Sequence, residues 1–260
     1  MSNCSVMFVV NDADYYVSHR MPIGLRLMEA GAVVHVVAPG PCPEMLRLHG
    51  IAYHEVPISR KGKNPVSELI TIYNLYCLFK RVNPDLVHLV TIKPYLYGGV
   101  AARLAGIKAV VSAVAGLGIL FSQNTLKSRF LRAILYPLYR FAFGHHRQTV
   151  IFQNHDDKAL LTRFARLPES KTVVIRGAGV DLSAYPFLPE AQGEIVVSLA
   201  SRLLKDKGVI EFIEASRILR QRGVTAVFWL IGTPDIGNAN TVTQEQLYSW
   251  EKEGLVKCLG

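Results

Sequence analysis

The sequence predicts an α/β fold made of two units, each with parallel strands joined by crossover helices. Short apolar runs alternate with amphipathic stretches along most of the 260 residues, as expected for buried strands and the helices that cover them. A polar stretch that contains two prolines, residues 181–193, interrupts this alternation, after which the pattern starts again. We therefore expect a Rossmann-like domain over residues 1–187 and a second one over residues 188–260.

The first unit opens with an apolar strand at residues 6–10. The next helix, 22–30, is expected to end before Gly31, because glycine adopts the left-handed conformation that often follows the last helical turn. The same reasoning places the other elements: strands at 33–38, 86–90, 109–114, 150–153 and 173–175, and helices at 66–81, 97–105 and 126–143.

The second unit repeats the pattern with strands at 195–200, 226–231 and 255–259 and helices at 208–222 and 243–253. Gly260 follows its third strand directly. Open α/β sheets normally continue to about five or six strands and bind ligands at their carboxyl ends. The sequence therefore predicts a partial second domain in a chain truncated at its C-terminus.

The composition is that of a globular protein, with 50% apolar and 19% charged residues. No apolar stretch reaches the roughly 18 residues of a membrane-spanning helix. No Lys or Arg precedes the first apolar run, so we expect no secretory signal and a cytoplasmic protein. The cysteines lack a C-x-x-C spacing, which favours plain thiols over a disulfide framework or a zinc site. They are Cys4, Cys42, Cys77 and Cys258.

The net charge of +9 is concentrated in the first unit. Residues 1–180 hold 21 Lys and Arg against 10 Asp and Glu, whereas residues 181–260 hold 8 against 10. The interval 86–155 contains no Asp or Glu at all. Such a surface attracts anions, and the charge alone leaves nucleic acid, anionic lipid and phosphorylated small molecules as candidates.

The first unit lacks the signature of a dinucleotide-binding domain. The first glycine after strand 6–10 is Gly24, so no G-x-G-x-x-G follows the strand directly, and an NAD site is not expected. Two isolated G-x-G pairs, Gly116 with Gly118 and Gly177 with Gly179, are equally explained as turn glycines.

A basic loop opens the second unit. Arg202 and Lys207 lie between strand 195–200 and helix 208–222, at the carboxyl edge of the sheet and beside a helix N-terminus. The helix dipole and the free N–H groups at such a position already favour an anion. The loop therefore predicts a diphosphate site, and the alternative is a solvated loop that carries basic residues by chance.

Runs of sequence along the whole chain carry a resemblance to a known family. They are VSHRMPIGLRLMEAGAVVHVVAP, HLVTIKPYLYGGVAARLAGIKAVVSAVAGLGILF, IFQNHDDKALL, IRGAGVDLSAYPF, ASRLLKDKGVIEFIEASRILRQRG and FWLIGTPDIGNANTVTQEQLYSWEKEGLVKCLG. In this order they resemble family 4 retaining glycosyltransferases of the GT-B fold, most of all bacterial enzymes of surface-polysaccharide and lipid-linked oligosaccharide assembly. The resemblance implies a complete N-terminal domain that holds the acceptor and a partial C-terminal domain that holds a nucleotide-diphospho-sugar, usually UDP-linked.

The resemblance also implies roles for residues of the donor side. Arg202 and Lys207 correspond to the pair that grips the donor diphosphate, and Gly232 lets the chain pass close to the nucleotide base. Fixed cations stabilise the charge that develops on the leaving diphosphate. No metal or other cofactor is therefore expected, and the nucleotide-sugar is a substrate.

On the acceptor side, the resemblance places Gly116 and Gly118 in the interdomain cleft near the transferred sugar. It implies that His19, Arg20 and Lys93 are cleft residues as well. For His19 the alternative is a histidine at a helix start whose ring is satisfied by the backbone.

The sequence departs from the family at two places. Residues 112–115 lack the histidine that many relatives have near the transferred sugar, so no catalytic residue is assigned. The family's two glutamates, separated by seven residues, are expected beyond Gly260. Glu245 and Glu253 have that spacing but lack the preceding glycine loop, and an exposed helix face explains them.

Basic and apolar side chains interleave over residues 126–147. This mixture is typical of a helix that lies on anionic lipid, where lipid-linked acceptors reside. Pro137 is expected to kink or split the helix. The alternative is a core-packed helix with snorkelling arginines. The residues expected to face the membrane are Lys127, Arg129, Arg132 and Arg140.

These observations predict a retaining hexosyl- or N-acetylhexosaminyltransferase, or the major fragment of one. Its expected acceptor is a polyprenyl-diphosphate-linked saccharide, and its expected place is the inner face of the cytoplasmic membrane. The alternative is a non-catalytic remnant that binds nucleotide or membrane. Nucleic acid is not an expected partner, because no recognition motif accompanies the charge.

Overall fold

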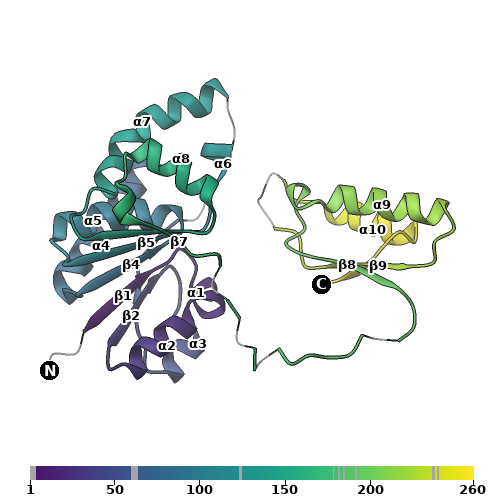
Figure 1. Cartoon of the computed structure of the whole chain (residues 1–260), viewed down its shortest axis with the longest axis horizontal. Coiled ribbons are helices and arrows are strands. Elements are labelled where there is room, and N and C mark those ends of the chain that lie inside the picture. The colour runs from purple at the N-terminus through teal and green to yellow at the C-terminus, as the bar shows by residue number, and fades with distance from the viewer. Residues whose placement is uncertain are drawn as a thin grey trace. The chain divides into compact units, whose positions relative to one another are not determined.

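The computed structural model describes residues 4–59, 64–122, 125–177, 179–180, 182–183, 185–190, 192–235, 238 and 240–260. The chain divides into two compact units, Met1–Asp181 and Leu182–Gly260, here called unit 1 and unit 2 (Figure 1). This division falls inside the polar stretch 181–193, six residues before the boundary that the sequence predicts.

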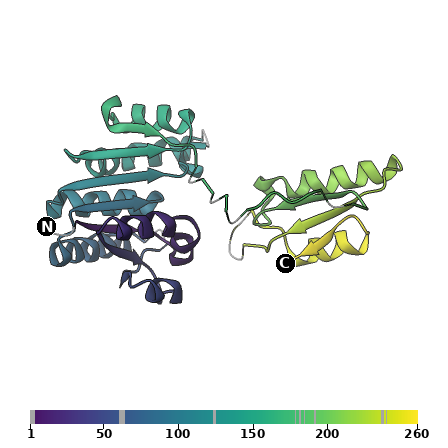
Figure 2. The same ribbon diagram turned by 60° about the horizontal axis from the view of Figure 1, so that its bottom comes forward.

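Unit 1 is built on a parallel sheet of seven strands in the order β3-β2-β1-β4-β5-β6-β7 (Figure 2). All the strands expected in this unit are present to within one or two residues, and β3 was not predicted, because AYHE has no apolar alternation. The strands are β1 Ser5–Val9, β2 Val33–Ala38, β3 Ala52–Glu55, β4 Leu86–Val90, β5 Ala109–Val114, β6 Gln148–Phe152 and β7 Thr172–Val174.

Helices cover both faces of this sheet. In Figure 1, α1 Ala13–His19, α2 Met21–Glu29 and α3 Glu44–Leu48 lie on one face, and four other helices lie on the other. These four are α4 Pro65–Val82, α5 Gly99–Ala105, α7 Leu126–Ala142 and α8 His155–Ala165. Short turns complete the unit: η1 Pro94–Gly98, which is π-helical, α6 Ile119–Ser122, and η2 Glu169–Lys171.

Polar caps fix where several helices start. The Asp12 side chain accepts hydrogen bonds from the backbone N–H groups of Asp14 and Tyr15, and Asn154 caps α8 in the same way through Asp157. Helices α1, α3 and α8 were not predicted. Of the two outcomes expected at Pro137, the split is wrong, because α7 continues as one helix through this residue, and the kink stays a prediction.

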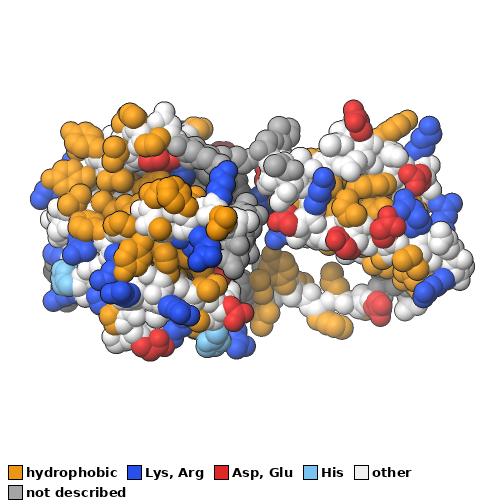
Figure 3. All heavy atoms as spheres, turned by 90° about the horizontal axis from the view of Figure 1, so that it is seen from above, with side chains coloured by type: hydrophobic (Ala, Val, Ile, Leu, Met, Phe, Trp, Pro, Cys, Tyr) orange, Lys and Arg blue, Asp and Glu red, His pale blue; other side chains and the backbone are white. Residues whose placement is uncertain are grey.

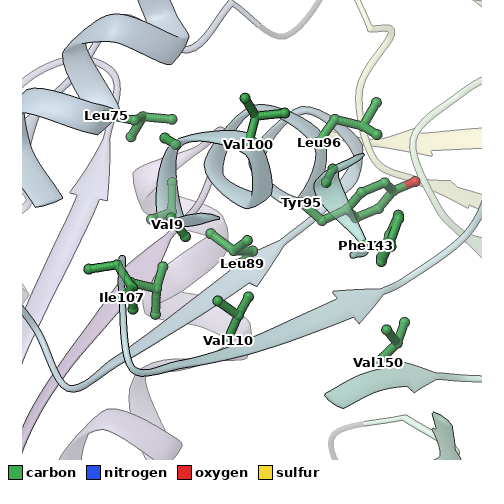
Figure 4. Packing of buried hydrophobic residues seen from close by; sticks show 14 of the residues in the cluster. Val9, Leu75, Leu89, Tyr95, Leu96, Val100, Ile107, Val110, Phe143 and Val150 are labelled. Atoms are coloured by element: carbon green, nitrogen blue, oxygen red, sulfur yellow. The ribbon is translucent and has the colours of Figure 1, made fainter. Parts of the chain in front are cut away.

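Two separate hydrophobic cores fill the spaces between the sheet and its helices. The larger core lies under α4, α5, α7 and α8, and Figure 4 shows Leu89 and Val110 of the sheet facing Tyr95, Val100 and Phe143. The smaller core joins β1 and β2 to α1, α2 and α3. The sheet is thus fixed on both sides, with the loops after its strands gathered at its carboxyl edge.

Unit 2 has a parallel three-stranded sheet in the order β10-β9-β8. Its elements are β8 Val196–Ala200, η3 Lys205–Lys207, α9 Val209–Gln221, β9 Val227–Ile231, α10 Gln244–Lys252 and β10 Lys257–Leu259. They confirm the predicted strand and helix order. A third core, which includes Val209, Ile213, Phe228, Leu230 and Leu247, packs α9 and α10 against one face of this sheet.

Candidate functional site

The loops that follow β8 and β9 touch each other at the carboxyl edge of unit 2. The Leu203 N–H donates to the Thr233 carbonyl at 3.1 Å, and the Gly232 backbone has a φ of 132°. A Cβ atom at Gly232 would lie 2.0 Å from the carbonyl oxygen of Ser201. Only glycine therefore allows the two loops to approach this closely, whereas contact of Gly232 with a nucleotide base stays a prediction.

Arg202 is held by an acidic partner that sequence reasoning missed. Its Nη1 donates to Oδ2 of Asp235 at 2.9 Å, and the Asn238 side-chain amide donates to the same oxygen at 3.2 Å. The Arg202 side chain remains 53% exposed, against 18% for Asp235. Asp235 comes soon after β9, and that position at the edge of the sheet is the signal that could have found it. The pair fixes the guanidinium while leaving part of it open to a ligand.

Lys207 closes the short turn η3 immediately before α9. Gly208 follows it with a φ of 80°, and no side chain caps the first N–H groups of α9. Lys207 is exposed, and among the described residues it forms no ion pair. The structure thus brings Arg202, Lys207, Gly232 and the uncapped start of a 13-residue helix to one edge. Cationic donors and a helix N-terminus are the groups that bind a phosphate.

In unit 1, Gly116 and Gly118 follow β5 and both have positive φ, 138° and 67°. A Cβ at Gly118 would lie 2.9 Å from Cδ1 of Ile92 in the neighbouring loop, whereas one at Gly116 would meet nothing within 4 Å. Both residues therefore have the positive φ on which the turn interpretation rests. A role beside the transferred sugar stays a prediction.

Lys93, in the loop after β4, is tied to a carboxylate that was not singled out from the sequence. Its Nζ lies 2.5 Å from Oε1 of Glu68 on α4, and the two side chains are only 16% and 15% exposed. The ammonium also lies over the Tyr97 ring at 5.8 Å from its centroid. The charge of Lys93 is thus balanced inside the protein, and its contact with an acceptor is not tested.

His19 and Arg20 lie at the junction of α1 and α2. The His19 ring is exposed, stacks on Tyr15 at 4.4 Å between centroids, and its Nδ1 lies 2.7 Å from the Ser18 hydroxyl. His19 therefore ends a helix and bonds to a side chain, so the alternative of a helix-start histidine satisfied by backbone is wrong. Arg20 is the N-cap residue of α2, and its Nε is buried without a hydrogen-bond partner among the described residues.

Glu245 and Glu253 lie at the two ends of α10, as an exposed helix face predicts. Glu253 Oε2 accepts a hydrogen bond from Arg217 Nη2 at 3.2 Å, and its Oε1 accepts one from the Ser249 hydroxyl at 3.2 Å. These bonds fix the end of α10 against α9.

Helix α7 exposes a row of large apolar side chains among its cations. Leu126, Phe130 and Ile134 are 83%, 70% and 55% exposed, which contradicts a fully core-packed helix for this part of α7. Near its end, Tyr139 and Ala142 are buried. Figure 3 views unit 1 from this side and shows apolar and basic side chains mixed over the face.

A basic recess of about 840 Å³ lies between α7 and α8. Arg129 and Arg132 of α7 line it together with Arg163 and Arg166, and Phe121, Tyr136 and Phe164 supply aromatic walls. The third predicted membrane-facing arginine differs, because Arg140 Nη1 donates to the Ala165 carbonyl at 3.4 Å. Contact of these side chains with lipid stays a prediction.

Within the described residues, no helix is both long and apolar enough to cross a bilayer. In the same part of the chain, no three His, Cys, Asp or Glu side chains are grouped to hold a metal ion.

Sequence comparison assigns the chain to a family. A protein-family model described as glycosyl transferase 4-like matches residues 5–154, more than half of the chain. The chain belongs to this family. Solved structures agree on the fold of this glycosyl transferase 4-like protein, which is of the GT-B type. Anabaena HepE in complex with UDP-glucose has a TM-score of 0.67 at 19% identity, covering 98% of this chain and 68% of HepE. A glycosyltransferase from Rickettsia africae has a TM-score of 0.66 at 17% identity, covering 100% of this chain and 69% of the other.

Two curated transferases are similar to this glycosyl transferase 4-like chain in sequence. The N,N'-diacetylbacillosaminyl-diphospho-undecaprenol alpha-1,3-N-acetylgalactosaminyltransferase of Campylobacter jejuni is 28% identical over 230 residues, 83% of this chain and 60% of that protein. The UDP-Gal:alpha-D-GlcNAc-diphosphoundecaprenol alpha-1,3-galactosyltransferase of Escherichia coli is 24% identical over 196 residues, 70% of this chain and 49% of that protein. The chain thus spans about half to three fifths of the length of these relatives.

Proposed function

We propose that this chain is a retaining glycosyltransferase, or the major fragment of one, that takes a sugar from a UDP-linked donor. The observation that carries the proposal is the edge of unit 2, where Arg202, Lys207 and the uncapped N-terminus of α9 lie on one loop and helix start. Family membership supports transfer of a sugar, and similar proteins that act on UDP-sugars or on undecaprenyl-diphosphate-linked saccharides support these classes of donor and acceptor.

On this proposal, the edge of unit 2 stabilises the diphosphate as it leaves the sugar. Negative charge builds on the bridging and terminal oxygens when the glycosidic bond breaks, and fixed cations offset that charge without reorganising. Asp235 orients the Arg202 guanidinium, so the cation is in place before the donor arrives. These residues supply the charge themselves, and no metal ion or other cofactor is part of the proposal.

The proposed acceptor is a saccharide linked to polyprenyl diphosphate, held by unit 1 at the inner face of the cytoplasmic membrane. Both curated relatives carry an undecaprenyl diphosphate acceptor in their names. The exposed apolar and basic side chains of α7 fit an anionic bilayer surface, where such acceptors reside.

Calorimetric titration with UDP tests the donor site. Arg202→Ala and Lys207→Ala are each expected to weaken UDP binding about tenfold or more, because each removes a charge-assisted contact, and the double variant should show no binding. Arg222→Ala is the matched control, since Arg222 is exposed at the opposite end of α9 from the proposed site. Unchanged affinity in the double variant contradicts the assignment.

Binding of nucleotide or membrane without turnover is the second candidate. It is favoured by Glu253, whose carboxylate is occupied by Arg217 and Ser249 rather than open to a ligand. Transfer of radiolabelled sugar from a UDP-sugar to a polyprenyl-diphosphate-linked saccharide separates the two candidates. Turnover eliminates the second candidate, whereas UDP binding with no transfer supports it.

A further inference from the structure

A small pocket with mostly apolar walls opens at the carboxyl edge of the sheet of unit 1. Its volume is about 150 Å³, and its walls come from the start of α2 and from the ends of β5 and β6. The polar side chains that line it are Arg20, His88 and Gln153, and no Asp or Glu is among the described residues of its lining. The pocket therefore has donors and positive charge but no carboxylate to balance them.

His88 is a polar residue in the interior of a sheet. It lies on β4 between Phe8 of β1 and Val111 of β5, and its ring stacks on Phe8 with 5.0 Å between centroids. The side chain is 9% exposed, and its Nε2 has no hydrogen-bond partner in the described structure. A buried polar atom without a partner is uncommon in folded proteins and calls for an explanation.

Arg20 presents a second unpaired donor to the same pocket. Its Nε is buried and lacks a hydrogen-bond partner among the described residues, and its charge lies close enough to His88 to lower the pKa of that imidazole. Burial lowers the pKa further, to about 4, so His88 is uncharged near neutral pH and carries one ring N–H. The N-terminus of the nine-residue helix α2 adds its positive dipole end at Arg20.

We propose that this pocket binds an oxyanion, a phosphate or a carboxylate, through the Arg20 guanidinium and the His88 imidazole. With the ring proton of His88 on Nε2, an oxygen of such a group would accept hydrogen bonds from this nitrogen and from Arg20 Nε at once, and the Gln153 amide adds a third polar group. All the residues that line this pocket belong to unit 1. This inference rests on the proposed function, in which unit 1 holds the acceptor, and the oxyanion is therefore a group of that acceptor.

Imidazole nitrogen resonances report directly on this pocket. The full chain, labelled with ¹⁵N, is titrated at pH 7 and constant ionic strength with inorganic phosphate, with glucuronate and with glucose. The His88 ring signals, assigned with a His88→Phe variant, are expected to shift in a saturable way with an anion and not with glucose. Arg20→Gln is expected to weaken that binding about tenfold or more. Arg26→Gln is the matched control, since Arg26 is an exposed arginine on the same helix and pairs with Glu29.

The two anions separate the sources of the oxyanion. A response to phosphate alone supports a diphosphate of the acceptor, and a response to glucuronate alone supports an acidic sugar. No response to either anion, an equal response to glucose, or full binding by Arg20→Gln overturns the proposal. These outcomes do not depend on UDP binding or on sugar transfer, so failure of the donor site and failure of this pocket are observed separately.

Discussion

Gly232 is the residue at which the carboxyl edge of unit 2 depends most on the absence of a single atom, a Cβ. The Ser201 carbonyl occupies the space that any Cβ would take, and the backbone has a positive φ. A side chain at this position would therefore incur two energetic costs. One is the strain of a positive φ, and the other is the displacement of the Ser201 backbone, which follows β8 directly. Arg202 is the next residue after Ser201, so its orientation depends on the same contact.

Gly232→Ala is expected to destabilise unit 2 by about 3 kcal/mol or more, because the substitution adds both costs. The matched control is Gly223→Ala, where φ is 72° but a Cβ would meet no atom within 4 Å. That change should cost only the backbone strain, about 1 to 2 kcal/mol. Urea unfolding followed by Trp fluorescence measures both values, since Trp229 and Trp250 lie in unit 2. Equal losses in the two variants would falsify the contact argument.

His88 makes folding sensitive to pH. Its pKa lies near 6.5 in an unfolded chain and is lowered to about 4 by burial and by Arg20. Between these values the unfolded chain binds more protons than the folded one, so the free energy of unfolding falls as the pH is lowered. The unfolding free energy lost through His88 reaches about 3 kcal/mol at pH 4 and is regained above pH 6.5.

The measurement compares the unfolding free energy of the wild-type chain with that of His88→Phe over this pH range. The difference isolates His88, because the pKa values of His35, His54 and His145 are lowered by burial in both proteins. The variant keeps an aromatic ring against Phe8 and should show the shallower pH dependence. Parallel curves for the two proteins would rule out the proposed protonation effect.

At the scale of elements, long patterns were predictable and short ones were not. Helices α4 and α7 span 18 and 17 residues, so their apolar spacing is unambiguous in the sequence. Helices α1 and α3 have 7 and 5 residues, too few to establish a period. For α8, Asn154 is a typical N-cap residue and marks the start of the helix in the sequence.

The candidate site shows the same difference between contacts that are local in the sequence and contacts between distant residues. Arg202 and Lys207 were predictable because a strand, a basic loop and a helix start follow one another in the sequence. Glu68 and Asp235 were not, because their partners Lys93 and Arg202 are 25 and 33 residues away in the chain. Only the packing of different elements brings such pairs together.

Helix α7 is the element expected to contact the membrane. The chain should float with phosphatidylglycerol vesicles, less so as salt rises, and Arg129→Glu with Arg132→Glu should abolish flotation. Both arginines line the basic recess. The matched control, Arg26→Glu with Arg47→Glu, makes the same charge change on α2 and α3, which cover the opposite face of the sheet. Equal flotation with neutral vesicles, or equal loss in the control, is the result that contradicts this role.

At the scale of the whole molecule, charge and function divide along the same line. Unit 1 carries the acid-free interval 86–155 and the proposed lipid and acceptor contacts, whereas residues 181–260 have a small excess of acidic side chains. Each unit has its own hydrophobic core. The excess of basic residues is thus confined to the unit that is proposed to approach anionic lipid. In unit 2, only Arg202 and Lys207 are proposed to bind the diphosphate of the donor.

The half-buried pair of Lys93 and Glu68 also constrains how this chain can change over evolutionary time. Loss of either partner would remove the ion pair and leave the other charge in a place that water reaches only in part, which lowers stability, while replacing both by apolar residues can be nearly neutral. Descendants of this sequence should therefore keep both residues or lose both. Positions 68 and 93 are then expected to change together, although they are 25 residues apart in the sequence.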